Sequence, residues 1–152
     1  MRSGKLIPSA LVALVALCTT AGVVLAANPH FNSASARRSG TNLTVSFKIS
    51  GLGDNQTITV TASAKATAEY QCINNGGKNP SAANKQQVSA NVSVSGDFTS
   101  GKNGSVNGTL TITPPPATLV CPPGQHLVLV SVKYENVKVS GGGDTASISG
   151  SF

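Results

Sequence analysis

The sequence of 152 residues contains no tryptophan, and its tyrosines and phenylalanines together number only six. Five of these six lie in phase with the apolar residues of predicted strands, and Phe31 is the exception. Aromatic side chains in such positions are typical of a core and not of an exposed stacking surface. The shortage therefore argues against a partner that is a nucleic acid, and it limits carbohydrate recognition to weak contacts of Asn and Lys.

Acidic residues and histidines are also scarce, at five and two. The acids lie singly among predicted turns and polar strand positions, so neither a carboxylate pair nor a histidine with an orienting acid is expected. The sequence has no Gly-x-Ser-x-Gly motif and no phosphate-binding loop that ends in Gly-Lys-Ser/Thr. The cysteines and histidines do not show the spacing of a zinc site. We therefore expect a protein without catalytic activity, cofactor or metal.

The first 26 residues have the pattern of a secretory signal peptide. Arg2 and Lys5 precede a long apolar run, and small residues surround Ala26 in "VVLAANPHF". We predict cleavage after Ala26, with Ala27 as the alternative. An uncleaved membrane anchor is the competing interpretation, since the apolar run is nearly long enough to span a bilayer. In both cases the remainder of the chain is extracellular.

Lipid attachment at Cys18 is not expected, because the bulky Leu17 stands where a lipoprotein signal requires a small residue. Cleavage leaves residues 27–152, which suffice for one domain and leave no predicted membrane span. We predict a polar N-terminal segment over 27–40, with little pattern and the character of a tether, followed by a single domain over 41–152. Nine basic and five acidic residues remain, so the net charge is about +4, which favours anionic surfaces such as cell-wall polymers.

Two cysteines remain after cleavage, Cys72 and Cys121. In an oxidising compartment we expect them to form a disulfide. The closed loop holds about 50 residues, for which the chain-entropy model gives about 4 kcal/mol of stabilisation.

Strict alternation of apolar and polar residues runs through most of the region after residue 41. In "TNLTVSFKIS" the apolar set is Leu43, Val45, Phe47 and Ile49, and the run from Ile58 to Cys72 continues the pattern as one very long strand or two strands joined by a bend. Further alternating runs cover residues 88–98, 106–112, 128–139 and 146–152. The sequence predicts an all-β fold, an antiparallel β-sandwich of six to seven strands that is immunoglobulin-like in general build, with a small barrel as the alternative.

The run "HLVLVSVKYENVKV" changes phase along its length. Val128, Val130, Val132 and Tyr134 share one phase, whereas Val137 and Val139 share the other. We predict a bulge or strand break near Glu135-Asn136, because a slip of one residue would otherwise turn side chains to the opposite face.

The sequence has two irregular segments, residues 73–87 and 114–126. The first follows Cys72 directly, and the second contains Cys121. The first is rich in Asn and Gly, and the second contains five prolines. A disulfide would bring the two loops together at one end of the fold, where polar residues form a candidate recognition surface. Its residues are Asn74, Asn75, Lys78, Asn79, Asn84, Lys85, Gln125 and His126. The competing interpretation is that the disulfide only tethers two long loops whose asparagines satisfy their own backbone.

The motif Cys72-x-Asn74-x-Gly76-Gly77-x-x-Pro80-x-x-x-Asn84-Lys85, followed later by Cys121-Pro122, resembles small exported proteins of actinobacterial type. The resemblance covers most of the chain after the signal peptide and implies no particular activity. We therefore expect a secreted, non-catalytic binding or structural module that uses loops 73–87 and 114–126. The alternatives are a weak carbohydrate- or cell-wall-binding protein and a self-assembling extracellular protein whose sheet edges pair.

Overall fold

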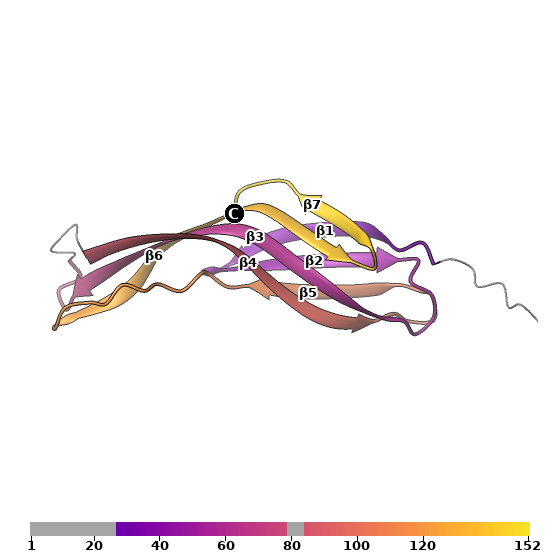
Figure 1. The fold of residues 1–152 in the computed structure, drawn as a ribbon, viewed down its shortest axis with the longest axis horizontal. Coiled ribbons are helices and arrows are strands. Elements are labelled where there is room, and N and C mark those ends of the chain that lie inside the picture. The colour runs from indigo at the N-terminus through magenta and orange to yellow at the C-terminus, as the bar shows by residue number, and fades with distance from the viewer. Residues whose placement is uncertain (1–26, 79–83) are drawn as a thin grey trace, which may run out of the picture.

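The computed structural model describes residues 27–78 and 84–152, and its elements are all β-strands. The seven strands are β1 (His30–Ser39), β2 (Asn42–Ser50), β3 (Thr57–Asn74), β4 (Lys85–Thr99), β5 (Val106–Ile112), β6 (Gln125–Gly141) and β7 (Asp144–Ile148). They form two antiparallel sheets, β1-β2-β5 and β4-β3-β6-β7, which pack face to face (Figure 1). The predicted antiparallel β-sandwich with one disulfide is confirmed. No helix long and apolar enough to cross a membrane occurs in the described part of the chain.

The core consists of the inward-facing side chains of four strands. These are Leu43, Val45, Phe47 and Ile49 of β2, Val60, Ala62, Ala64, Ala66 and Ala68 of β3, Val106, Leu110 and Ile112 of β5, and Val132, Tyr134, Val137 and Val139 of β6. On β2, β3 and β5 the buried residues follow the alternation of the sequence, because successive side chains of a strand point to opposite faces. The six aromatic side chains all lie in this core or pack against it, including Phe31.

The segment 27–40 differs from its prediction as a patternless tether. Residues 30–39 form β1, which pairs antiparallel with β2 from His30↔Ser50 to Ser39↔Asn42. The small side chains of Ala34 and Ala36, together with Phe31, pack against the core. β1 is therefore part of the sandwich, and the tether interpretation is wrong for these ten residues.

β6 contains the predicted irregularity at Glu135-Asn136. Ser63 and Lys65 of β3 stand opposite Lys138 and Glu135, so β6 holds one extra residue, and Asn136 adopts a φ of 53°. The bulge keeps Tyr134 and Val137 both buried. This prediction is confirmed.

A second bulge in β6 was not predicted. Glu69 and Tyr70 pair with Ser131 and Leu129, so the extra residue is Val130. Val130 is 49% exposed, and Leu129 packs against the core in its place. The predicted inward phase of Val128 and Val130 is therefore wrong.

The four-stranded sheet extends well beyond the three-stranded one. β3, β4 and β6 have 18, 15 and 17 residues, whereas β5 has seven. Figure 1 shows these three strands continuing past the ends of β2 and β5. The inner face of this extension meets the proline-rich segment 113–124, where the Tyr70 hydroxyl donates a hydrogen bond of 2.7 Å to the carbonyl oxygen of Pro115.

Candidate functional site

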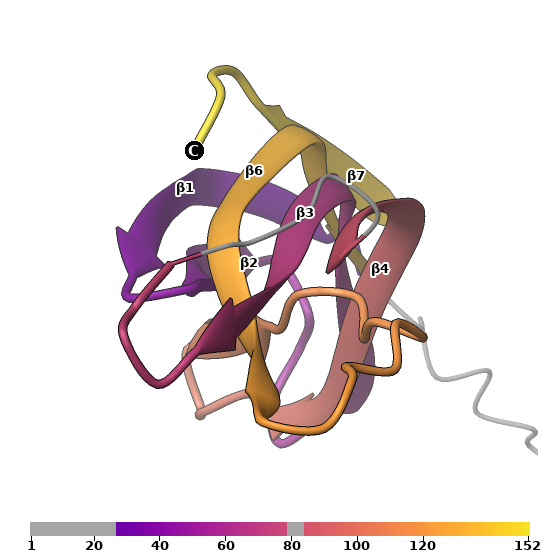
Figure 2. The same ribbon diagram turned by 90° about the vertical axis from the view of Figure 1, so that its left-hand side faces the viewer.

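The disulfide joins the end of β3 to the proline-rich segment. Cys72 is fully buried, and its Cα lies 5.5 Å from that of Cys121. The bond brings together residues 73–78, 84–87 and 113–130, which we call the disulfide end. Figure 2 views the molecule from this end. The disulfide end lies far from residues 27–29, which enter the fold at the opposite end (Figure 1).

The loops at the disulfide end are shorter than the sequence suggested. β3 continues to Asn74 and β4 begins at Lys85, so strand residues occupy both ends of the predicted loop 73–87. Gln125 and His126 belong to β6, where they pair with Asn74 and Ile73. Four of the eight candidate residues, Asn74, Lys85, Gln125 and His126, therefore lie on strands, which hold side chains more rigidly than loops do.

Three of the candidate polar residues come together. Asn74 stands opposite Gln125 in the sheet, and the Asn84 side-chain amide donates a hydrogen bond of 3.0 Å to Oε1 of Gln125. All three are half-buried. Asn75, Lys78, Lys85 and His126 are exposed around them. Asn79 lies outside the described residues.

Asn74 has a structural role in the turn that follows β3. Its Oδ1 atom accepts hydrogen bonds of 3.0 Å from the backbone N–H groups of Gly76 and Lys78. The backbone of Asn74 also donates to the carbonyl oxygen of Lys78 and accepts from the N–H of Gly77. At this position the interpretation that asparagine satisfies its own backbone is the correct one.

Gln86 is a further organising residue that sequence reasoning missed. Its Oε1 accepts hydrogen bonds from the N–H groups of Thr118 and Leu119, and its Nε2 donates to the Thr118 hydroxyl at 2.7 Å. One side chain thus fixes the backbone of the proline-rich segment to β4. The sequence did indicate this role, because Gln86 is polar but shares the inward phase of Val88 and Ala90.

The disulfide end also exposes apolar side chains. Val120, Leu127 and Val130 are 86%, 41% and 49% exposed, and they are the exposed large hydrophobic residues of the described chain. Because all three lie at one end, they indicate an interaction surface more strongly than scattered exposed residues would.

Positive charge dominates the disulfide end. Lys78 and Lys85 are exposed there. The sequence has no acidic residue between 70 and 96 or between 98 and 134. The nearest acid along β3 is Glu69, whose carboxylate accepts a hydrogen bond of 2.9 Å from the Ser131 hydroxyl. An anionic partner would therefore meet little repulsion at this end.

The remaining ionisable groups lie elsewhere. A hydrogen bond from Lys133, at 2.7 Å, lowers the pKa of Glu135, and hydrogen bonds from the N–H groups of Phe31 and Thr145 lower the pKa of Asp144. Burial raises the pKa of Tyr134, whose hydroxyl donates to the carbonyl oxygen of Thr41. Among the described residues no three His, Cys, Asp or Glu side chains gather as metal ligands would.

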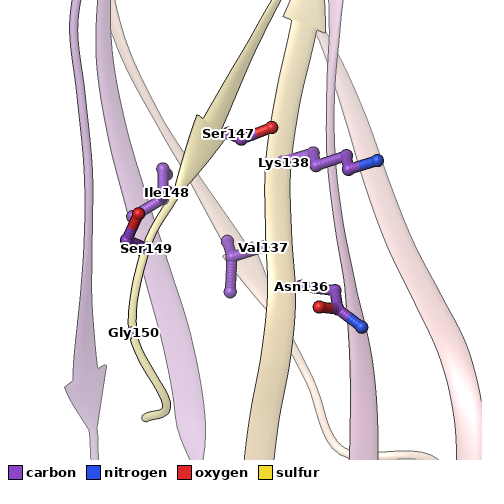
Figure 3. A pocket seen from close by; sticks show the side chains of 7 residues that line it. All are labelled: Asn136, Val137, Lys138, Ser147, Ile148, Ser149 and Gly150. Carbon is purple, nitrogen blue, oxygen red and sulfur yellow. The ribbon is translucent and has the colours of Figure 1, made fainter.

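A surface hollow of about 390 Å³ lies beside the bulge in β6. The hollow lies where the chain leaves β6 after Ile148, the end of β7, and before the backbone of Phe152 pairs with Tyr134 of β6 again. Figure 3 shows its lining, in which Asn136 and Lys138 extend to one side of β6 and Ile148 lies on the other. Its lining includes Lys138 but no acid or histidine.

No family model matches the sequence, and no similar curated protein is found.

Proposed function

We propose that the chain is a secreted, non-catalytic binding module that contacts an anionic polymer of the cell surface through its disulfide end. One observation carries the proposal. The exposed apolar residues Val120, Leu127 and Val130 lie at the same end of the fold as the exposed Lys78 and Lys85, on a base held by the disulfide. Apolar and positively charged side chains on a rigid support are suited to a polymer that carries both negative charge and apolar surface.

Export is part of the proposal. The pattern of residues 1–26 predicts a signal peptide, and these residues lie outside the described part of the chain. The disulfide supports an oxidising, extracellular type of environment.

An immunoglobulin-like build is also part of the proposal. β1-β2-β5 and β4-β3-β6-β7 correspond to the strand order A-B-E and C′-C-F-G of such sandwiches. The disulfide does not bridge the two sheets as in antibody domains, because Cys121 lies in the connection between β5 and β6.

Neutral carbohydrate is the less favoured ligand. Sugar rings usually stack on exposed aromatic faces, and here the six aromatic side chains pack in or against the core. The anionic groups of a cell-wall polymer would instead interact with Lys78, Lys85 and His126.

Co-sedimentation with insoluble cell wall tests this proposal. The probe is peptidoglycan that carries anionic teichoic polymers, compared with the same peptidoglycan after the polymers are removed. We expect binding to the first, weakened by salt, and a loss of about tenfold in the variant Lys78→Ala/Val120→Ser. Lys102→Ala is the matched control, since Lys102 lies in the exposed turn before β5 and away from the disulfide end. Equal binding by all variants, or equal binding to both peptidoglycans, would refute the proposal.

A further inference from the structure

The edge of the four-stranded sheet formed by β4 is unusually open. β4 pairs with β3 from Thr57↔Thr99 to Gln71↔Lys85, and the strand order places no described strand on its other side. Figure 2 shows β4 at the border of the sheet, on the opposite side of β3 from β6. A free edge presents a row of N–H and C=O groups that can pair with another strand.

β4 lacks most of the usual protections of an edge strand, although it contacts β5 and its Gln86 is hydrogen-bonded to Thr118 and Leu119 of the proline-rich segment. Its 15 residues contain no proline, its pairing with β3 has no bulge, and Lys85 and Asp97 are its only charges. Native edges are usually short, bulged, charged or covered. The other edges are protected in these ways. β7 has five residues and β5 has seven, β1 and β7 contact each other, and the free part of β6 contains the Val130 bulge.

The inner side of β4 is only half-covered. Its inward-facing residues Val88, Ala90, Val92 and Val94 are all partly exposed. A groove of about 530 Å³ separates residues 90–94 from residues 111–116 of the opposite layer. A strand added beside β4 would cover both the backbone edge and this groove.

When two copies of β4 are placed antiparallel, residues that can pair stand opposite each other. We propose that two copies of the chain pair their β4 strands antiparallel about a twofold axis at Asn91, so that two four-stranded sheets join into one. In this register Lys85 of each copy stands opposite Asp97 of the other, because the two charges lie six residues on either side of Asn91. Directly opposed side chains of opposite charge stabilise an antiparallel pair.

The same register matches the apolar residues. Val88 stands opposite Val94 and Ala90 opposite Val92 on the inner face, and Ser89 stands opposite Ser93 on the outer face. An axis at Ala90 or Val92 would also keep inner residues opposite inner ones, but it would separate Lys85 from Asp97. The charges therefore select one register among those that the alternation allows. The pairing is isologous, so it closes as a dimer and does not propagate along this edge.

Charge reversal tests the pairing. Sedimentation velocity over a range of concentrations is measured for the chain from residue 27 onward, which contains all seven strands of the described residues. We expect dimers of the unaltered chain. Lys85→Asp and Asp97→Lys are each expected to weaken the dimer by about tenfold or more, because each places like charges opposite one another twice. The double variant Lys85→Asp/Asp97→Lys is expected to restore it.

Asp97 also accepts a hydrogen bond of 2.6 Å from the Thr59 hydroxyl, so circular dichroism is used to check that each variant folds. If Asp97→Lys fails to fold, Lys85→Asp and the variant Asn91→Asp give the same test. Asn91→Asp opposes two carboxylates at the axis, while Lys65 beside it on β3 favours the new charge within each copy. A chain that remains monomeric at millimolar concentration would overturn the proposal, as would a dimer that these charge changes do not weaken.

A crosslink reports the register directly. In Asn91→Cys the two new thiols would stand opposite each other at a distance that a disulfide can bridge, so mild oxidation is expected to give a covalent dimer. Lys133→Cys, on the exposed face of β6, is the control and is expected to remain monomeric. Equal crosslinking of the two variants would overturn the proposed register.

Discussion

Gly108 of β5 is a position where a single added methyl group is expected to disturb the core. An ideal Cβ at this residue would lie 2.4 Å from Cζ of Phe47 and 2.5 Å from Cε1 of Phe98. The two rings meet edge to face with centroids 5.0 Å apart. Ordinary contact begins near 3.4 Å, so each ring would have to move by about 1 Å (3.4 − 2.4 = 1.0 and 3.4 − 2.5 = 0.9).

The rings have little room for this movement. Phe47 is 4% exposed and also meets Phe31, with ring centroids 6.3 Å apart. Overpacking of a core typically costs about 1 to 3 kcal/mol. Alanine is favoured over glycine within a strand by about 0.5 to 1 kcal/mol, which offsets part of this cost. Because two rings would have to move at once, we expect the upper end of the overpacking cost, so Gly108→Ala should lower the free energy of unfolding by about 2 kcal/mol after the offset. This is a substantial part of the roughly 5 to 15 kcal/mol of a typical domain.

Urea unfolding followed by circular dichroism measures this effect, because the chain has no tryptophan for fluorescence. Gly101→Ala is the matched control. Its Cβ would meet only Asn103 Oδ1 at an ordinary 3.4 Å, so we expect a change within about 0.5 kcal/mol. In the double variant Gly108→Ala/Phe98→Leu the smaller side chain makes room for the new methyl group. The double variant is therefore expected to lose about 1 kcal/mol less than the sum of the losses in the two single variants. A Gly108→Ala variant as stable as the unaltered chain, or strictly additive effects, would refute the argument.

Three further predictions concern the disulfide, the bulge and pH. Replacing Cys72 and Cys121 by serine is expected to lower the free energy of unfolding by up to about 4 kcal/mol, and adding reductant to the unaltered chain should cause the same loss. Urea titration measures both losses, and a change below about 1 kcal/mol would contradict the loop-closure argument. Asn136 has a φ of 53°, which glycine adopts freely and a β-branched residue does not. Asn136→Gly is therefore expected to be tolerated, and Asn136→Val is expected to lower the free energy of unfolding by about 1 to 2 kcal/mol in the same assay. Equal stability of the two variants would count against the bulge. Hydrogen bonds from two backbone N–H groups lower the pKa of Asp144 below its ordinary 3.8, so the stability that they contribute is present above about pH 4 and is lost as the pH falls through the lowered pKa. Unfolding midpoints between about pH 4 and pH 2 are therefore expected to fall more steeply for the unaltered chain than for Asp144→Asn, and parallel curves would contradict this.

The alternation of the sequence predicted the strands whose two faces differ. In β2 and β3 every second residue is apolar, and the structure buries that set apart from the partly exposed Ile58 and Tyr70. The change of phase at Glu135-Asn136 was visible because polar residues separate Tyr134 from Val137. β1 was missed because "HFNSASARRS" has small or polar residues in both phases, and it becomes a strand by pairing with β2. The second bulge was missed because "LVLV" at 127–130 is apolar at every position and so has no readable phase.

The candidate site was predictable in its position but only partly in its residues. Two cysteines and two irregular segments were enough to bring residues 73–87 and 114–126 to one end, and the structure places both there. The hydrogen bonds of Gln86 and the exposure of Leu127 depend on how the proline-rich segment crosses the sheet. Such a crossing is set by tertiary contacts and not by local pattern.

The path of the proline-rich segment also explains why the disulfide end needs a covalent bond. β3, β4 and β6 extend past β5, so their inner face there is covered by a chain segment with five prolines. Proline has no N–H to donate, so this segment cannot add a regular strand and is instead held by side chains of Tyr70 and Gln86 and by the disulfide. The interpretation that the disulfide tethers two loops and the proposed recognition surface therefore concern different residues of the same end. Half-buried amides such as Asn84 hold the fold together, and the exposed side chains of Lys78 and Val120 face outward on that rigid support.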